Sequence, residues 1–456
     1  MPPQPPSAAS RDEPVIRDRG DACPGALRLH AADDGHLARI RIPGGMLDAD
    51  AALLLADAAD RLGDGHIDLT SRGNAQLRGL GASCGGELQT VLVRAGLLPA
   101  PTHERVRNIV ASPLTGLDRR GLPDVAPWVA ELDRLLCASA PAAGLSGRFL
   151  FALDDGRGDV TSLAADVNLA AVRDGGRALL WTADAADALL VAAADAPRAA
   201  LVAAAYFLDA VRRAGTRAWR VSELPAEQAL RSDELGARLA AAGVSASVVR
   251  GRAALRGPAP EPGVVQGPGG AAALSVFAPL GRLTTAQWRR LAGLTGRVRL
   301  TPWRGIVVPG LPAHAADGAL AALAGAGLVT GPEDPWRSVT ACTGRPGCAK
   351  SLADVRADAR AVVAQQAEAE AQAETPAQAR AQTPAQATRL LPVHWSGCER
   401  RCGHPRGTAW ADVVATADGY DLCAAGRAPR RGLPASELPA ALAAVRRTTS
   451  HDAAKK

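Results

Sequence analysis

The stretch IDLTSRGNAQLRGL, residues 67–80, has a second copy further along the chain, VRLTPWRGIVVPGL at residues 298–311. Thr70 aligns with Thr301 in this repeat, and Leu80 aligns with Leu311. A strand-like segment, a glycine turn and a helix-like segment precede each copy. Such a unit leaves one face of its sheet uncovered when it is alone. We therefore expect two half-domains that pair about a pseudo-twofold axis.

A weaker second repeat joins the segments that follow the half-domains. ERVRNIVASPLTGLD (104–118) resembles RSVTACTGRPGCAKS (337–351), and GLSGRFLFALDDG (144–156) resembles LPVHWSGCERRCG (391–403). In the same alignment Asp166 falls on Asp412. The chain thus alternates a small half and a large half twice, which predicts an internally duplicated α+β fold.

The predicted boundaries follow from these repeats and from the low-complexity segments. They are a disordered N-terminus at 1–20, a half-domain at 21–83, a larger α+β domain at 84–255, a second half-domain at 270–330, a larger α+β domain at 334–432 that carries the clustered cysteines, and a disordered tail at 440–456. An Ala/Gln/Glu-rich tract at 365–389 is expected to be a helix that runs into a disordered surface insertion.

Composition excludes several classes of protein. The 456 residues are 47% apolar and carry a net charge of +6, with 52 Lys and Arg against 46 Asp and Glu. The weak basic excess is not gathered into a tail or stripe, so we expect no nucleic-acid partner. We also expect no membrane span and no signal peptide, because the apolar stretch at 188–211 is interrupted by Asp195 and Arg198. A cytoplasmic monomer is the expectation.

Four cysteines form two close pairs in the C-terminal quarter of the chain. Cys342 and Cys348 have five residues between them, and Cys398 and Cys402 have three. Four thiolates suit a zinc ion or an iron–sulfur cluster, whereas a disulfide would need an oxidising compartment. The five-residue gap fits a zinc knuckle less well than shorter gaps do. Spacing alone leaves the cluster, zinc and a chance arrangement open.

These residues together resemble the nitrite/sulfite reductase family. The resemblance is carried by Cys-x5-Cys followed by Cys-x3-Cys, by LTSRGNAQLRG (69–79) and by RIRIPGG (39–45), and it covers about residues 22–430. It implies a 4Fe–4S cluster on Cys342, Cys348, Cys398 and Cys402. In the reductases the last cysteine also bridges to sirohaem iron, which would be Cys402 here.

Within the family, the motifs NAQLRGL (74–80), LTPWRG (300–305) and FALDDG (151–156) resemble the precorrin-3B synthase branch. That resemblance implies a monooxygenase of aerobic cobalamin biosynthesis, which hydroxylates the tetrapyrrole precorrin-3A with dioxygen and forms a lactone. Because the chain has no G-x-G-x-x-G between a strand and a helix, electrons from NADH are expected to arrive through a separate flavin reductase or ferredoxin. The alternatives are a sirohaem-dependent nitrite or sulfite reductase, and a non-catalytic zinc or iron–sulfur binding protein.

A tetrapyrrole carries a fringe of carboxylates, which arginine forks recognise well. The resemblance places the substrate-binding candidates on five motifs: Arg39, Arg41, Arg72, Asn74, Gln76, Arg107, Arg148 and Arg304. Period-2 alternation predicts that Arg72, Asn74 and Gln76 share one face of a strand. The alternative is that they are ordinary exposed residues of an arginine-rich chain.

Two further features bear on the choice of substrate. Leu150 stands where sulfite reductases carry a second cation, and an apolar side chain cannot neutralise a small dianion. His394 and His404 flank the second cysteine pair and leave open an additional non-haem iron, although we expect each to be structural. No catalytic residue is assigned.

Overall fold

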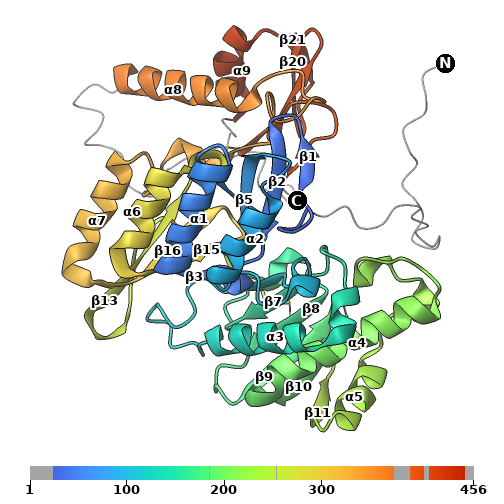
Figure 1. The fold of residues 1–456 in the computed structure, drawn as a ribbon. Coiled ribbons are helices and arrows are strands. Elements are labelled where there is room, and N and C mark those ends of the chain that lie inside the picture. The colour runs from blue at the N-terminus through green and yellow to red at the C-terminus, as the bar shows by residue number, and fades with distance from the viewer. Residues whose placement is uncertain (1–23, 184, 253, 374–390, 405–409, 447–456) are drawn as a thin grey trace, which may run out of the picture.

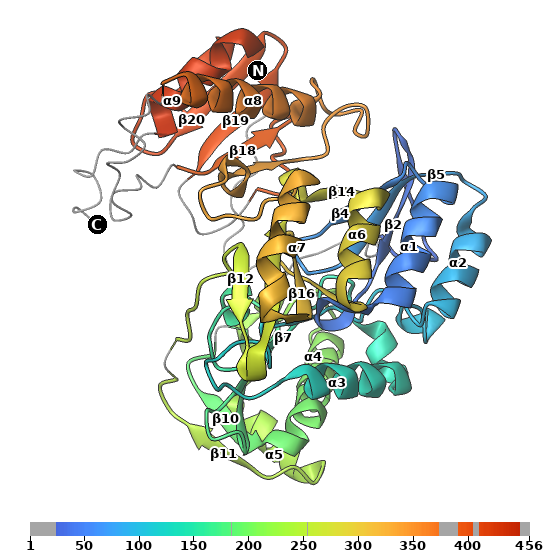
Figure 2. The ribbon, with the colours of Figure 1, turned by 90° about the vertical axis from the view of Figure 1, so that its left-hand side faces the viewer.

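The computed structural model describes residues 24–183, 185–252, 254–373, 391–404 and 410–446. The molecule is built in three parts (Figures 1 and 2). Two paired half-domains lie in the middle, the first large domain packs on one side of them, and the cysteine-bearing domain packs on the other. The predicted α+β class and the internal duplication are confirmed.

Each half-domain contributes most of one five-stranded sheet. The order in the first sheet is β1-β2-β5-β4-β14, with bounds β1 (His30–Ala32), β2 (Gly35–Ile40), β5 (Ala75–Leu80), β4 (His66–Leu69) and β14 (Arg282–Thr284). The order in the second sheet is β12-β13-β16-β15-β3, with bounds β12 (Gly263–Gln266), β13 (Ala271–Phe277), β16 (Gly305–Pro312), β15 (Arg297–Leu300) and β3 (Met46–Asp48).

The two half-domains exchange one edge strand each. β3 precedes β4 in the chain but pairs with β15, and β14 precedes β15 but pairs with β4. A helix follows each exchanged strand: α1 (Ala49–Leu62) after β3 and α6 (Thr285–Thr295) after β14. The Asp48 carboxylate caps α1 and the Thr284 hydroxyl caps α6, so both helices begin in the same way. This exchange is the structural form of the predicted pseudo-twofold pairing.

The helices of both half-domains cover one side of the two sheets. α1 packs against α6, where the Trp288 indole N–H donates to the Ala52 carbonyl oxygen at 2.8 Å. α2 (Gly85–Arg94) and α7 (Ala313–Gly325) lie beside them. Leu88 and Leu92 of α2 are buried in the same core as α1. The first half-domain therefore extends beyond residue 83, because α2 completes its core.

The two large domains share one topology. The sheet of the first large domain begins with three parallel strands, β6 (Ile109–Ala111), β7 (Phe151–Asp154) and β8 (Val167–Ala171). Three antiparallel strands continue it: β9 (Arg177–Thr182), β10 (Ala188–Ala192) and β11 (Ala246–Val249). The helices of this domain are α3 (Ala126–Ala138), α4 (Ala196–Arg213) and α5 (Ser232–Ala241). In the second, parallel β17 (Val339–Ala341), β18 (Val393–Ser396) and β19 (Ala411–Thr416) are followed by antiparallel β20 (Gly419–Ala424) and β21 (Arg430–Leu433), with α8 (Val355–Ala373) and α9 (Leu438–Arg446).

The strand register corrects the weaker repeat. In the first sheet Phe151 pairs with Ile109 on one side and with Val167 on the other. In the second sheet Val393 pairs in the same way with Val339 and Ala411. Loops of different length shift the true correspondence away from the ungapped sequence alignment. Asn168, and not Asp166, therefore corresponds to Asp412.

The predicted disordered tail is also corrected, because the chain forms α9 over Leu438–Arg446. Leu438 and Leu442 are buried in the core of the cysteine-bearing domain, and Arg446 donates to the Leu391 carbonyl oxygen at 2.9 Å. The helix has an apolar side that α8 and the sheet cover. α8 runs through the first part of the predicted insertion to Ala373. The N-terminus 1–20, the rest of the insertion from 374, and residues 447–456 lie outside the described residues.

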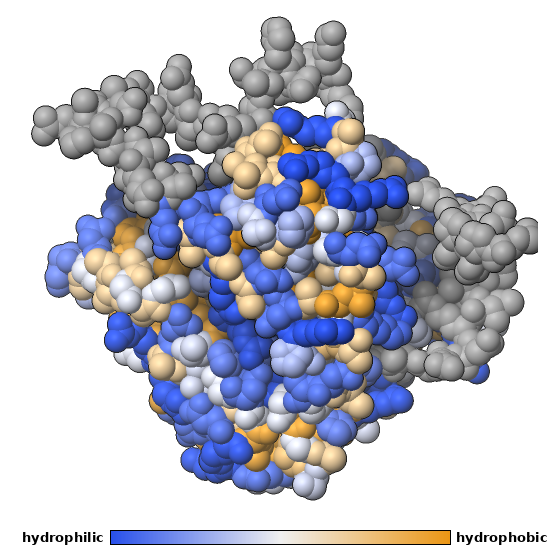
Figure 3. Space-filling view, turned by 90° about the horizontal axis from the view of Figure 1, so that it is seen from above, coloured by the Kyte–Doolittle hydropathy of each residue, from blue (hydrophilic) through white to orange (hydrophobic). Residues whose placement is uncertain are grey.

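None of the helices in the described ranges is long and apolar enough to cross a membrane. The face drawn in Figure 3 mixes hydrophilic and apolar residues over the cysteine-bearing domain.

Candidate active site: a polar sheet face beside four cysteines

The four clustered cysteines lie on two loops that leave the same sheet edge. Cys342 directly follows β17, and Cys398 follows β18 after one glycine. Because β17 and β18 are parallel, their carboxyl ends meet at one edge. The Cys342 N–H donates to the Trp395 carbonyl oxygen at 2.9 Å, and the Gly397 N–H donates to Cys342 Sγ at 3.2 Å. The two loops are therefore tied together at the cysteines.

The second cysteine of each loop faces the same space. Burial raises the pKa of the Cys402 thiol, and the neighbouring thiols Cys342, Cys398 and Cys348 raise it further. All four are free thiols. Within the described ranges, no three His, Cys, Asp or Glu side chains stand together at the spacing of a single metal ion. A 4Fe–4S cluster takes four thiolates, one on each iron, so the kind and number of these donors suit such a cluster.

The first half-domain closes over the Cys348 loop. The Arg78 guanidinium donates to the Asp34 carboxylate in a bidentate pair at 2.8 Å, and its Nη2 also donates to the Gly347 carbonyl oxygen at 2.8 Å. Asp33 accepts a hydrogen bond from the Ala349 N–H. The β1–β2 turn and β5 thus fix the position of the loop that carries Cys348.

A row of charged and polar side chains crosses the first sheet next to these loops. Arg39 of β2 pairs with Gln76 of β5, Gln76 pairs with Asp68 of β4, and Asp68 pairs with Arg282 of β14. Arg39 donates to Gln76 Oε1 at 3.2 Å. Ala38 and Leu77, which alternate with these residues, are buried in the core on the helix side. We call this row, together with Arg78, the polar sheet face.

Arg356 of α8 links the polar sheet face to the cysteines. Its Nη1 lies 3.3 Å from Asp68 Oδ1, and its Nε donates to the Cys342 carbonyl oxygen at 3.2 Å. Asp68 thereby serves both Arg282 and Arg356. Arginines outnumber carboxylates along this seam, which suits an anionic occupant.

The other end of the polar sheet face meets the first large domain. Arg72 donates to the carbonyl oxygens of Gly147 and Arg148 at 3.0 Å each. Asn74 Oδ1 accepts from the Ile42 N–H at 2.8 Å, and Arg41 Nε donates to the Arg105 carbonyl oxygen at 3.2 Å. The structure thus brings Arg39, Arg41, Arg72, Asn74 and Gln76 to one region. Arg72 and Asn74 nevertheless belong to the β4–β5 turn and not to a strand, because the Thr70 hydroxyl accepts from both of their N–H groups.

The remaining arginine candidates are placed elsewhere. Arg107 is buried and makes a bidentate pair with Asp133 at 2.7 Å, and its Nη1 donates to the Leu97 carbonyl oxygen at 2.8 Å. These contacts hold the first large domain to the segment after α2. Arg148 is exposed, with its guanidinium 4.7 Å from the centre of the Trp219 ring. Leu150 is buried in a small apolar cluster that Trp303 covers.

Arg304 lies on the cysteine side of the site. A Cβ at Gly403, the residue after Cys402, would stand 3.4 Å from Arg304 Nη2. Burial lowers the pKa of Arg304, as does the charge of Arg356, while Asp68 opposes the shift. Arg304 also acts on His394, whose pKa burial lowers to about 3, with smaller contributions from His404 and Arg304. His394 is thus a neutral, buried residue whose Nδ1 lies 2.8 Å from the Thr340 hydroxyl.

The chain was compared with known proteins. The nitrite/sulfite reductase ferredoxin-like half-domain family matches it twice, over residues 30–83 and 265–326. The chain has the fold of the nitrite/sulfite reductase family. It is 29% identical to a ferredoxin–nitrite reductase of Synechococcus elongatus over 81% of this chain and 74% of that protein, and 28% identical to a precorrin-3B synthase of Sinorhizobium over 92% and 86%.

The fold agrees with this assignment. The solved structure of the NirA protein of Mycobacterium tuberculosis superposes with a TM-score of 0.66 at 20% identity, over 89% of this chain and 79% of that one. The names of the curated relatives are those of oxidoreductases, which supports an enzyme of that class.

The first large domain keeps the outline of the cysteine site without its thiols. The Ser112 N–H donates to the Leu153 carbonyl oxygen, as the Cys342 N–H does to Trp395. The Asp155 N–H donates to Ser112 Oγ at 3.2 Å, as the Gly397 N–H does to Cys342 Sγ. Ser112 therefore occupies the position of Cys342. Five residues separate it from Asp118, the same spacing as Cys342 to Cys348.

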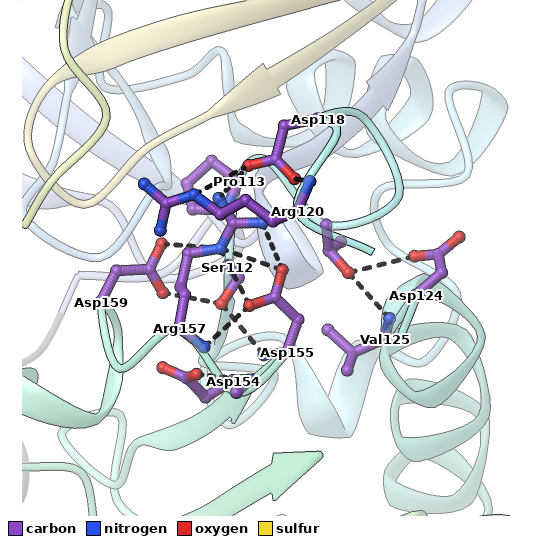
Figure 4. A network of polar contacts seen from close by, with 12 residues as sticks. Ser112, Pro113, Asp118, Arg120, Asp124, Val125, Asp154, Asp155, Arg157 and Asp159 are labelled. Atoms are coloured by element: carbon purple, nitrogen blue, oxygen red, sulfur yellow. Dashed lines mark hydrogen bonds and ion pairs between the residues drawn. The ribbon is translucent and has the colours of Figure 1, made fainter. Parts of the chain in front are cut away.

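A guanidinium stands beside Ser112 at the corresponding strand ends (Figure 4). Arg157 pairs with Asp155 through Nε at 2.9 Å and Nη2 at 2.5 Å, and its Nη1 lies 3.0 Å from Asp118 Oδ2. Asp159 accepts from the Ser112 hydroxyl at 2.7 Å. Both large domains thus build a compact site at the same strand ends, one of thiols and one of ion pairs.

Burial raises the pKa of Asp159 to about 7, and the charge of Asp154 adds to the shift. The Asp159 carboxylate also lines a cavity of about 220 Å³ between the first large domain and residues 258–265. That cavity lies away from the cysteines and belongs to this second position.

Sequence analysis missed Asp68, Arg78, Arg282 and Arg356. Only Arg78 had a usable signal, since it continues the alternation of Asn74 and Gln76 along LTSRGNAQLRG. The other three join the site through pairings between distant segments.

Proposed function

We propose that this chain is a monooxygenase of the precorrin-3B synthase type, which hydroxylates precorrin-3A with dioxygen and forms a lactone. The observation that carries the proposal is the similarity to the Sinorhizobium precorrin-3B synthase, which runs over 92% of this chain and 86% of that protein. One oxygen atom of O₂ enters the product, and the other leaves as water with two electrons and two protons.

Cys342, Cys348, Cys398 and Cys402 would hold a 4Fe–4S cluster, which supplies one-electron transfer when it is bound. The polar sheet face, including Arg39 and Arg78, would hold the carboxylates of the substrate by charge-assisted hydrogen bonds. The end of the polar sheet face that meets the first large domain would be supported by Arg41, Arg72, Asn74, Gln76 and Arg148. Arg107 pairs with Asp133 and therefore has a structural role. Orientation of the macrocycle is thus the contribution of the protein itself.

Electrons ultimately from NADH would arrive through a separate donor protein, a ferredoxin or a flavin reductase. An additional non-haem iron is not part of the proposal, because buried His394 and its neighbour His404 already contact protein groups.

A sirohaem-dependent nitrite reductase is the second candidate. The similarity to the Synechococcus ferredoxin–nitrite reductase favours it, at 29% identity over 81% of this chain. The two candidates differ in the size of the anion they must neutralise. Leu150, which is buried among apolar side chains, removes a cation from the region where a small anion would need it.

The deciding experiment is an assay of anaerobically purified, cluster-loaded protein with precorrin-3A, a reductant and ¹⁸O₂, followed by mass spectrometry. We expect one labelled oxygen atom in the product and no product without oxygen. Full turnover under anaerobic conditions, or nitrite reduction by sirohaem-loaded protein, would favour the reductase instead.

Arg39→Gln tests the role of the polar sheet face. We expect it to weaken precorrin-3A binding about tenfold or more, because a hydrogen bond to a charged group contributes roughly 1.5–3 kcal/mol. Iron content should not change. Arg134→Gln, which removes a cation from an exposed pair on α3, is the matched control and should bind as the wild type does.

A further inference from the structure

Arg304 adopts a backbone conformation that its counterpart in the first half-domain reserves for glycine. Thr301 and Thr70 cap equivalent turns: the Thr301 hydroxyl accepts from the Gly305 N–H at 3.0 Å, and the Thr70 hydroxyl from the Asn74 N–H at 3.1 Å. In these turns Gly73 has φ 63° and Arg304 has φ 62°. A left-handed conformation is strained for a residue other than glycine.

The fold makes room for this side chain. A Cβ at Gly281 would stand 2.6 Å from Arg304 Cδ, so only a glycine there leaves room for the aliphatic part of Arg304 just before β14. The guanidinium then ends beside Gly403, which follows Cys402. A strained residue held in place by a glycine on another segment indicates a constrained role for its side chain.

The guanidinium is left with an unused donor. Arg304 Nη1 is buried and has no hydrogen-bond partner among the described residues. No carboxylate of the described chain lies within ion-pair distance of Arg304, since nearby Asp68 is engaged by Arg282 and Arg356. A buried, unpaired cation is costly unless an anion completes it.

We propose that Arg304 is a positioning residue that donates a hydrogen bond to the anionic cluster, on the side of Cys402, and raises its reduction potential. The inference rests on the cluster of the proposed function but not on the identity of the substrate. A cation next to the cluster stabilises the reduced state more than the oxidised state, because reduction adds one negative charge. The alternative partner of Arg304 is a carboxylate of the tetrapyrrole substrate. The experiment below distinguishes this carboxylate from the cluster.

The experiment is a redox titration of the substrate-free, cluster-loaded protein, followed by electron paramagnetic resonance. Arg304→Gly places at this position the residue that its counterpart turn carries, so the backbone is relieved of strain. We expect the ratio of reduced to oxidised cluster at a fixed potential to fall about tenfold, a shift of about 59 mV for one electron. Arg304→Lys, which keeps the charge but loses the fork, should shift less.

Arg289→Gln removes a cation that pairs with Asp57 and Asp60 on the helix side, and should leave the potential unchanged. If Arg304→Gly loses its iron, Arg304→Met carries the measurement. An unchanged potential with full iron content overturns the proposal, even if precorrin-3A is turned over. Loss of substrate affinity with an unchanged potential assigns Arg304 to the substrate. If the wild-type protein does not turn over precorrin-3A but Arg304→Gly still lowers the reduction potential, only the proposed function is contradicted.

Discussion

Asp159 shows how one residue position is used differently in the two large domains. It lies with Asp155 and Ser112 at strand ends where the other domain carries cysteines. The carboxylate is fully buried, and its Oδ2 is 3.9 Å from Arg157 Nε, an ion pair too long for a hydrogen bond. This residue is therefore held in a site that compensates its charge incompletely.

We expect the stability of the protein to depend on pH through Asp159. Its pKa is about 7 in the folded state against 3.8 for the free side chain, so between these values only the folded state keeps the proton. The free energy of unfolding then falls as pH rises from about 4 to about 7. Asp159→Asn removes this loss, so its stability relative to the wild type should be greater at pH 8 than at pH 5, by at most about 3 kcal/mol.

Denaturant unfolding of both proteins at pH 5 and pH 8 checks this expectation. Asp174→Asn is the control, because that exposed carboxylate pairs with Arg177 and its pKa is lowered, so it stays charged across this range. An equal difference between Asp159→Asn and the wild type at both pH values would contradict the assignment.

Among the residues of the site, those set by local pattern could be predicted and those set by long-range pairing could not. The two cysteine pairs, Gln76 and Arg39 follow from motif and alternation. The engagement of Arg107, which lies in the loop before β6, depends on Asp133 of α3, so no local pattern reports it. Arg356 similarly reaches Asp68 across 288 positions of sequence. Side chains that join distant elements become visible only when the elements are packed.

At the scale of elements, α9 shows why a short segment near the C-terminus can still be part of a core. It is nine residues long, too short to be stable in isolation. Its stability comes from Leu438, Ala441 and Leu442, which α8 and the sheet bury. Sequence periodicity over so few residues is weak, which explains why the tail was expected to be disordered.

Truncation tests the contribution of α9. A chain that ends after Glu437 loses the buried leucines and the Arg446 contacts with Leu391 and Ser338. We expect it to lose about 2–5 kcal/mol of stability, the range for removal of a buried leucine side chain, and to lose iron as the cysteine-bearing domain loosens. A chain that ends after Arg446 keeps every described contact and is the control. Equal melting temperatures for the two truncations would contradict this role.

The strand exchange could not be predicted from the sequence either. β3 and β14 have three residues each, and their residues MLD and RLT carry no signal about which half-domain they join. The long repeat predicted that two halves pair, because a repeated strand–helix–strand unit must cover its open face. The partners of the edge strands depend on the geometry of the whole pair.

At the scale of the whole molecule, only one of the two large domains is expected to depend on metal. The ion pairs of Arg157 hold the site of the first large domain, whereas the four thiols of the second would be joined to one another only through a bound cofactor. Cys398→Ser should therefore lower iron content and soluble yield, and limited proteolysis of its soluble fraction should degrade residues after about 334 first. Cys137→Ser, which changes a thiol of the first large domain, is the control and should keep full iron content.

Mass spectrometry of the proteolytic fragments identifies which part survives. Survival of a fragment that spans the half-domains and the first large domain agrees with this division of labour. Simultaneous loss of both large domains in Cys398→Ser would show that they fold as a single unit.

The exchange of β3 and β14 also bears on how the molecule arose. A protein that consisted of one copy of the repeat would have lacked the fifth strand of its sheet, because that strand is always supplied by the other copy. It could have completed the sheet only by borrowing the strand from an identical subunit, as domain-swapped homodimers do. Fusion of two genes turned this exchange of strands between subunits into an exchange within one chain. From then on the two copies no longer had to be identical, and thiols could persist at the strand ends of one copy while a serine and ion pairs came to stand there in the other.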